Sequence, residues 1–240
     1  METQSERQAK NRWYRVSLRT FLLVMCVASV VLGQFIVRAK RQQAAVRECI
    51  ELGGEAVYQT QYNFNKHDWG GPSPATRWYE SEWVRDYLTS VVMLSVNSEH
   101  FDASHLRSLP HLDRLSLFNA QQSEIEDVGR LSKLKVLQLQ GQNVSDLGPL
   151  CELHQLEQIG LVDVGASDIS FLSRLDSLQS VAIVGCQIEN FESLAKLKKL
   201  LAITISRTPI SDEQIAKLRR ELPGCTIQVL ARPNEDPEPE

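Results

Sequence analysis

The feature that most constrains this chain is an apolar triplet, L-x-x-L-x-L, that recurs along its second half. Its copies begin at Val91, Leu112, Leu134, Leu156, Leu178, Leu200 and Leu222, which are 22 residues apart after a first step of 21. A period in this range indicates a solenoid, because one such unit buries its apolar face only by stacking on its neighbours. The sequence therefore predicts stacked units over 91–230, with one interior row formed by Leu115, Leu137, Ile159 and Val181.

Each unit combines two apolar spacings. The triplet alternates with period two, which is typical of a short strand with one buried face. Further apolar residues follow at a spacing of three, as in Val144, Leu147, Leu150 and Leu153. That spacing fits a 3₁₀ turn better than a long α-helix. We therefore expect an α/β solenoid with parallel strands on its concave face and short 3₁₀ or α turns on its convex face.

A polar residue stands at the thirteenth position of the units, just before the residues at a spacing of three. These residues are Glu124, Asp146, Asp168, Asn190 and Asp212. A short Asp or Asn side chain accepts hydrogen bonds from the backbone N–H groups that open a helical turn. We interpret the ladder as a repeated cap. A cation-binding ladder is the alternative, and it is disfavoured because backbone donors already lie beside each acceptor.

Three segments carry a family resemblance. Residues 134–155 (LKVLQLQGQNVSDLGPLCELHQ) and 167–175 (SDISFLSRL) resemble internalin-type bacterial leucine-rich repeats, and residues 210–229 are similar to the closing repeat of bacterial membrane-anchored repeat proteins. The resemblance implies a leucine-rich-repeat fold over roughly residues 84–230. It fails at the ninth position, where the family's Asn is replaced by Ala120, Gln142, Val164 and Thr208, and only Cys186 fits the Asn/Cys alternative. This departure implies looser loops after the strands.

The N-terminal region predicts a membrane anchor. Residues 1–15 are polar and basic and are expected to be disordered, while residues 21–37 contain no charge and support a transmembrane helix over 16–38. A cleaved signal peptide is the alternative, but no A-x-A cleavage site is evident. Five basic residues precede the apolar stretch and four follow it, which is nearly a tie under the positive-inside rule. We expect a single-pass membrane protein with its repeats outside the cytoplasm, and a possible homodimer through Ser29 and Gly33.

Both ends of the solenoid need covers. We expect residues 39–90 to form a helix–strand–helix cap, with Val46, Cys49 and Ile50 on one helix face, a strand over 55–64 and a helix over 78–88. At the other end, Ser211 and Gln214 match a capping box that opens an α-helix. The tail over 231–240 is acidic and rich in proline, so we expect it to be disordered.

Motifs for chemistry are missing from the sequence. It contains no P-loop, nucleophile elbow, H-E-x-x-H or C-x-x-C motif, so we expect no cofactor, no metal and no enzymatic activity. Cys151 and His154 could meet on one turn, but no third group orients the histidine. The net charge of −4 argues against nucleic acid as a partner. No cysteine of one unit stacks on a cysteine of the next, so no disulfide is evident, and this favours a reducing compartment. It argues against the expectation that the repeats lie outside the cytoplasm.

The remaining candidate is the face formed by side chains that alternate with the buried ones. This face is nearly uncharged and carries apolar residues at its middle, as interface centres do. The candidate partner-binding residues are Phe118, Val136, Gln138, Gln140, Gln158, Val162 and Val184. The sequence thus predicts a membrane-anchored module that binds an unknown protein. The alternative for the face is that its small residues only let the strands curve. The alternatives for the protein are a self-associating structural protein of the envelope and an enzyme with an unrecognised site.

Overall fold

The computed structural model describes residues 18–58 and 90–230. The chain divides into two units, Met1–Ala39 and Lys40–Glu240. The described part of the first unit belongs to helix α1 (Leu18–Glu51), which is long and apolar enough to cross a membrane. The sequence predicted separate helices before and after residue 38, whereas α1 has no break there. Residues 38–50 contain neither Gly nor Pro, so nothing interrupts the helical backbone.

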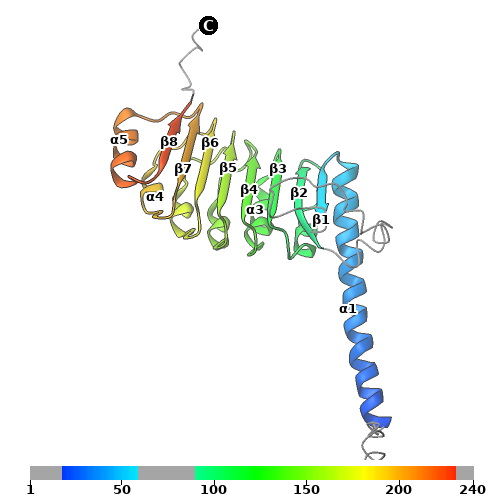
Figure 1. Cartoon of the computed structure of the whole chain (residues 1–240). Coiled ribbons are helices and arrows are strands. Elements are labelled where there is room, and N and C mark those ends of the chain that lie inside the picture. Colours follow the sequence, from blue (N-terminus) through cyan, green and yellow to red (C-terminus); the bar gives the residue numbers. More distant parts are fainter. Residues whose placement is uncertain (1–17, 59–89, 231–240) are drawn as a thin grey trace, which may run out of the picture. The chain divides into compact units, whose positions relative to one another are not determined.

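The second unit is built on one eight-stranded sheet whose strand order follows the chain (Figure 1). Strand β1 (Glu55–Tyr58) pairs antiparallel with β2 (Val91–Asn97). The strands from β2 onward pair in parallel, and the others are β3 (Arg114–Phe118), β4 (Val136–Gln140), β5 (Gln158–Val162), β6 (Ser180–Val184), β7 (Ala202–Ser206) and β8 (Thr226–Val229). This arrangement is the predicted α/β solenoid.

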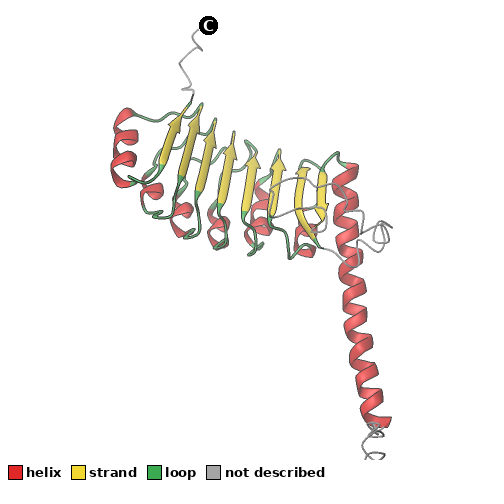
Figure 2. Ribbon diagram, in the orientation of Figure 1, coloured by secondary structure: helices red, strands yellow, loops and turns green. Residues whose placement is uncertain are grey.

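Short helical segments connect the parallel strands and lie on one side of the sheet (Figure 2). They are η2 (Ala103–Ser108), α3 (Gln122–Gly129), η3 (Gly148–Glu152), η4 (Ser170–Arg174), α4 (Glu192–Ala195) and α5 (Asp212–Glu221). Three of them are 3₁₀ turns, as the spacing of three predicted. Segment α3 is an α-helix of eight residues, and its start is fixed by a capping box in which Glu124 accepts the backbone N–H of Gln121 at 2.9 Å.

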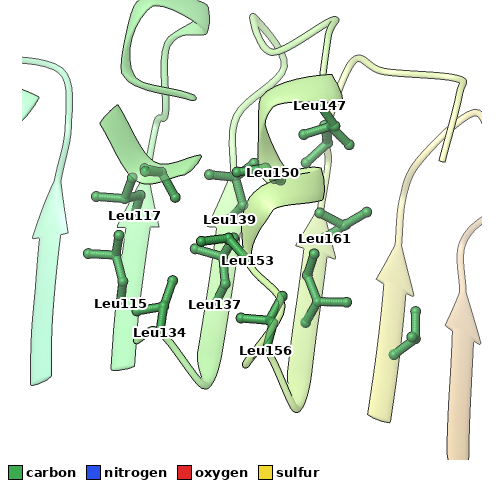
Figure 3. Packing of buried hydrophobic residues seen from close by; sticks show 14 of the residues in the cluster. Leu115, Leu117, Leu134, Leu137, Leu139, Leu147, Leu150, Leu153, Leu156 and Leu161 are labelled. Carbon is green, nitrogen blue, oxygen red and sulfur yellow. The ribbon is translucent and has the colours of Figure 1, made fainter. Parts of the chain in front are cut away.

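Interior rows of leucine and its relatives hold the units together. The predicted row is confirmed, because Leu115, Leu137, Ile159 and Val181 are successive register partners and each is at most 3% exposed. Leu137 and Leu139 of β4 lie beside Leu150 and Leu153 of the return segment (Figure 3). Burying one such side chain contributes about 1.5–3 kcal/mol. Stacking of units is therefore the main source of stability.

The predicted step of 22 residues is wrong for the last unit. Ile203 pairs with Ile227, and so the register of β7 and β8 differs by 24 residues. Cys225 was expected in the interior row, but it precedes β8. The reason is α5, a ten-residue helix that replaces the shorter turns of the preceding units. Its chain must still return to the sheet, and this takes two more residues.

The predicted repeated cap is confirmed at three of its five positions. Asp146, Asp168 and Asn190 each accept the backbone N–H of the residue two positions later, at 2.7, 2.7 and 2.8 Å. Asp212 is instead the first residue of α5, whose N-cap is Ser211 in the predicted capping box. Glu124 is the third residue of α3 and acts as the reciprocal partner of its cap.

The end of α1 covers the first unit of the solenoid. Val46 and Cys49 are buried as predicted, whereas Ile50 is 59% exposed, so its predicted place on that face is wrong. The buried face runs through Gln42 and Ala45 instead. In addition, Glu48 accepts the backbone N–H of Asp102 at 2.9 Å and pairs with the imidazole of His105.

Strand β1 continues this cover. The register shifts between Val57 and Tyr58, and both side chains are buried, so the two faces of the strand do not alternate strictly there. The rest of the predicted strand over 55–64, the helix over 78–88, the basic segment 1–15 and the tail 231–240 lie outside the described residues.

Candidate interaction surface

The strand face comprises the side chains of β2–β7 that point away from the interior. Register brings the predicted residues of four adjacent strands together on it. Val136 is opposite Gln158, and Gln140, Val162 and Val184 are successive partners. Gln138 lies in the row between them, with Ser116 and Gly160 beside it. Phe118 ends β3 at the same level as Asn97 of β2 and is 36% exposed. The structure therefore assembles all seven predicted residues on one surface, and their binding role remains a prediction.

The middle row of this face is made of small side chains, with Gln138 as the exception. From β2 to β7 its members are Ser95, Ser116, Gln138, Gly160, Ala182 and Thr204. A Cβ atom placed on Gly160 would meet only Cγ of Gln138, at 3.7 Å. The backbone therefore does not require glycine here, and the space above it is open to a partner.

Charge is confined to the margins of the strand face. Arg114 is the one charged residue among the outward positions of β2–β7. At the amino ends of the strands, Lys135 and Asp113 approach to 4.0 Å. At the carboxyl ends, Arg207 and Asp163 form an ion pair at 3.6 Å. An uncharged centre with a charged border resembles the division of a protein interface into core and rim.

The loops at the carboxyl ends of the strands turn through the left-handed region. Asn119, Asp163, Gly185 and Arg207 occupy the same place in their units and have φ between 48° and 69°. A Cβ atom on Gly185 would collide with Oδ1 of Asp163. Glycine at this position therefore leaves room for the carboxylate of Asp163, which pairs with Arg207.

The absence of the family's Asn does not leave these loops without support. Thr208 donates its hydroxyl to the carbonyl of Ser206 at 3.1 Å and accepts the N–H of Cys186 at 3.1 Å. Cys186 is fully buried, and burial raises the pKa of its thiol. Ala120 and Val164 are buried at the equivalent places. At Thr208 a hydroxyl thus makes two of the hydrogen bonds that the missing amide would make, and the looser loops stay a prediction.

The candidate chemical groups are dispersed. The thiol of Cys151 donates to Glu152 and accepts from Arg174, each at 3.6 Å, and neither contact involves His154. His154 approaches Glu152 at 4.0 Å instead. Within residues 18–58 and 90–230, no three His, Cys, Asp or Glu side chains lie close enough together to hold a metal ion.

Sequence reasoning missed a cavity of about 280 Å³ away from the strand face. Its lining is largely apolar and also contains Arg107, Asp127 and Arg130. Both guanidinium groups bind Oδ1 of Asp127, at 2.6 and 3.1 Å. No sequence signal pointed to it, because the two arginines come from different units and have no common motif. The carboxylate satisfies the cations, so the cavity has the character of a structural ion-pair site.

No family model and no curated protein sequence matches the chain. Internalin C2 of Listeria monocytogenes is similar in structure, with 21% identity, 58% of this chain and 74% of that chain covered, and a TM-score of 0.49. A leucine-rich-repeat protein of Leptospira interrogans has 18% identity, 56% and 34% coverage, and a TM-score of 0.44. This chain therefore spans about a third of the Leptospira protein. The strand register and buried leucine rows show that the chain folds as a leucine-rich-repeat solenoid.

Proposed function

We propose that this protein is a membrane-anchored interaction module whose strand face binds a protein partner. The carrying observation is the outward face of β3–β6, which has one charged residue, Arg114 at the amino end of β3, and in which the half-buried side chains of Gln140, Val162 and Val184 form one row. A sheet face that stays in water usually carries charged side chains, and on this sheet the charged side chains lie at the border of the strand face. Removing apolar surface from water contributes about 25 cal/mol per Å². A partner that covers this face loses little to desolvation of charge.

The shape of the middle row suits an inserted side chain. Gly160 leaves open space beside Gln138, and larger residues such as Val136 and Val162 stand in the rows on either side. Large side chains often carry most of the binding energy of an interface. The glutamine amides beside Gly160 can donate and accept hydrogen bonds. We therefore expect a partner that presents an apolar or aromatic side chain together with polar groups.

Helix α1 supplies the proposed anchor. Its apolar side chains between Phe21 and Val37 are about half exposed, and its length suits a bilayer. A cleaved signal sequence would have the same composition, but a retained helix is favoured because the sequence has no A-x-A cleavage site. An anchor confines the strand face to one membrane and raises its effective concentration toward membrane partners. We expect the repeats to lie outside the cytoplasm, and a topology reporter fused after Glu240 would test this placement.

A homodimer through Ser29 and Gly33 remains a separate proposal for the same helix. The hydroxyl of Ser29 donates to the carbonyl of Cys26 at 2.9 Å, so it is satisfied within the helix. A Cβ atom on Gly33 would meet nothing within 4 Å. Small residues at this spacing allow two helices to approach closely. Gly33→Leu should then reduce association of the helices without changing membrane insertion.

The strand face is tested by a charge reversal of its apolar row. In the double variant Val162→Asp and Val184→Asp, two carboxylates would have to be desolvated on binding, which costs several kcal/mol per buried charge. The variant should therefore lose partners recovered with the full-length chain from solubilised membranes. The matched control is Ser132→Asp with Gln155→Asp, which adds the same charge at exposed positions away from the strand face. Equal recovery of the partners by both double variants would exclude the strand face as the binding surface.

A further inference from the structure

The last strand of the sheet is incompletely covered. The inward side chains of the preceding strands, such as Ile203 and Ile205 of β7, are fully buried. Their partners in β8, Ile227 and Val229, are only partly buried, although they belong to the same rows. Leu230, directly after β8, is 66% exposed. Among the described residues, no strand lies along the outer edge of β8. The solenoid thus ends in an apolar edge where a cover is expected.

The hydrogen-bond directions of β8 show which groups this edge offers. The N–H of Thr226 donates to Leu201 at 2.8 Å, and the N–H of Leu230 donates to Ile205 at 2.9 Å. Both groups therefore point toward β7. In a parallel ladder the N–H and C=O groups of alternate residues point to opposite sides. Ile227 and Val229 consequently direct their backbone groups outward, where a further strand would pair with them.

We propose that this edge pairs with β8 of a second copy of the chain, antiparallel and about a two-fold axis. Ile227 and Val229 each direct one N–H and one C=O outward, so about a two-fold axis the donors of one edge meet the acceptors of the other, as a two-fold interface requires. Opposite residues in an antiparallel pair point to the same face. This rule, with the outward groups of Ile227 and Val229, allows a pair centred on Gln228, in which Ile227 of each copy is opposite Val229 of the other.

The alternative register, centred on Ile227, is disfavoured. It would place Cys225 opposite Val229 and would need the N–H of Cys225 for the ladder. That N–H already donates to the carbonyl of Leu222 at 3.0 Å. The pair centred on Gln228 uses only groups that are directed outward. It forms four backbone hydrogen bonds between the copies, two from each Ile227–Val229 pair.

Charge favours the same arrangement. After Leu230 the sequence continues with Glu235, Asp236, Glu238 and Glu240 against one cation, Arg232. In a pair centred on Gln228, Leu230 of one copy is opposite Thr226 of the other, which lies five residues after the last turn of α5. That turn carries Arg219 and Arg220. Proline at positions 233, 237 and 239 lacks the N–H of a ladder strand, so the chain's own tail is poorly suited to fill the edge.

Four residues of strand bury less surface than a stable soluble dimer needs. The pairing should therefore depend on confinement in the membrane, and in this respect it rests on the proposed anchor. Membranes that contain the full-length chain are the appropriate sample. Recovery of the chain in the membrane fraction tests the anchor separately, and disulfide formation does not depend on partner binding to the strand face.

The test is disulfide cross-linking at the centre of the pair. Opposite residues that do not exchange hydrogen bonds have Cα atoms about 4.5 Å apart, which is within the range for a disulfide. In a background with Cys26, Cys151 and Cys225 changed to serine, Gln228→Cys should give a disulfide-linked dimer on mild oxidation. The matched control is Thr204→Cys, at the partner position of β7 on the same face. Two further strand spacings separate its copies, so it should give no dimer.

A second variant separates edge pairing from folding. Val229→Pro removes an N–H that does not bond β7, so the fold should be retained in circular dichroism while the Gln228→Cys dimer is lost. Equal cross-linking at positions 228 and 204, or a dimer that survives Val229→Pro, would overturn the proposal. Adducts to another protein alone would also overturn it and indicate a different occupant. So would a dimer that forms only after deletion of residues 231–240, because the tail would then occupy the edge.

Discussion

Leu137→Ala is the most direct perturbation of the solenoid interior. Leu137 is fully buried in the middle of its row, with Leu115 on one side and Ile159 on the other. The substitution removes three carbon atoms from a place where the flanking strands are fixed by hydrogen bonds on both sides. The cavity therefore has little means of collapse, and the loss should lie above the low end of the range of about 2–5 kcal/mol for such changes. We expect about 3–4 kcal/mol from the free energy of unfolding.

For a unit of this size, each kcal/mol lowers the midpoint of thermal unfolding by about 2–4 °C. The expected decrease for Leu137→Ala is thus roughly 6–16 °C. Thermal unfolding of the full-length chain in detergent micelles, followed by far-ultraviolet circular dichroism, would measure it. Urea unfolding of the same samples would give the free energy separately.

The matched control is Leu201→Ala. Leu201 directly precedes β7 and is 60% exposed, so removal of the same atoms should change the free energy of unfolding by no more than about 0.5 kcal/mol. The comparison isolates burial from the chemistry of the substitution. Equal losses for the two variants, or a loss below about 1 kcal/mol for Leu137→Ala, would refute the interior row as the source of stability.

Three further variants test the loops and caps. Burial raises the pKa of Glu124 above its ordinary value of 4.5, so its ionisation lowers the free energy of unfolding as pH rises. The free energy of unfolding of Glu124→Gln should therefore equal or exceed that of the wild type at pH 7. Lowering the pH toward 4.5 should stabilise the wild type relative to the variant. An unchanged difference between pH 7 and 4.5 would contradict this. Gly185→Ala should lose about 1–3 kcal/mol through its left-handed backbone, and adding Asp163→Ala should recover the part due to the collision, as urea unfolding would measure. Asp168→Ala should lose about 1 kcal/mol because the N–H of Ser170 loses its acceptor; a loss near zero would argue against the repeated cap.

The solenoid itself was predictable because its interior repeats a simple rule. Leu115 and Leu137 need only face one side of adjacent strands, and period two ensures this. The caps at Asp146 and Asp168 were predictable for a similar reason, since each acts on the backbone two residues ahead. Local chemistry of this kind is encoded within a few residues.

Features set by longer-range packing were not predictable. Ile50 fits the apolar pattern of its helix, but the position of the sheet selects a face through Ala45 and Cys49 instead. Cys225 was misplaced by two residues because the length of α5 changes the last step. The outward residues of the strand face followed from alternation, so the seven candidates were found together. The open edge of β8 has no sequence signature, since it depends on which strand comes last.

Site-specific photo-cross-linking tests the central claim that the strand face is the binding surface. A photoreactive benzoylphenylalanine introduced at Gly160 would occupy the open space beside Gln138, and the same residue at exposed Gln155 would sample a surface away from the face. We predict one specific protein adduct from position 160 in intact membranes and no such adduct from position 155. The adduct from position 160 should be lost in the Val162→Asp and Val184→Asp background. The same adduct from both positions, or one that persists in the double variant, would contradict it.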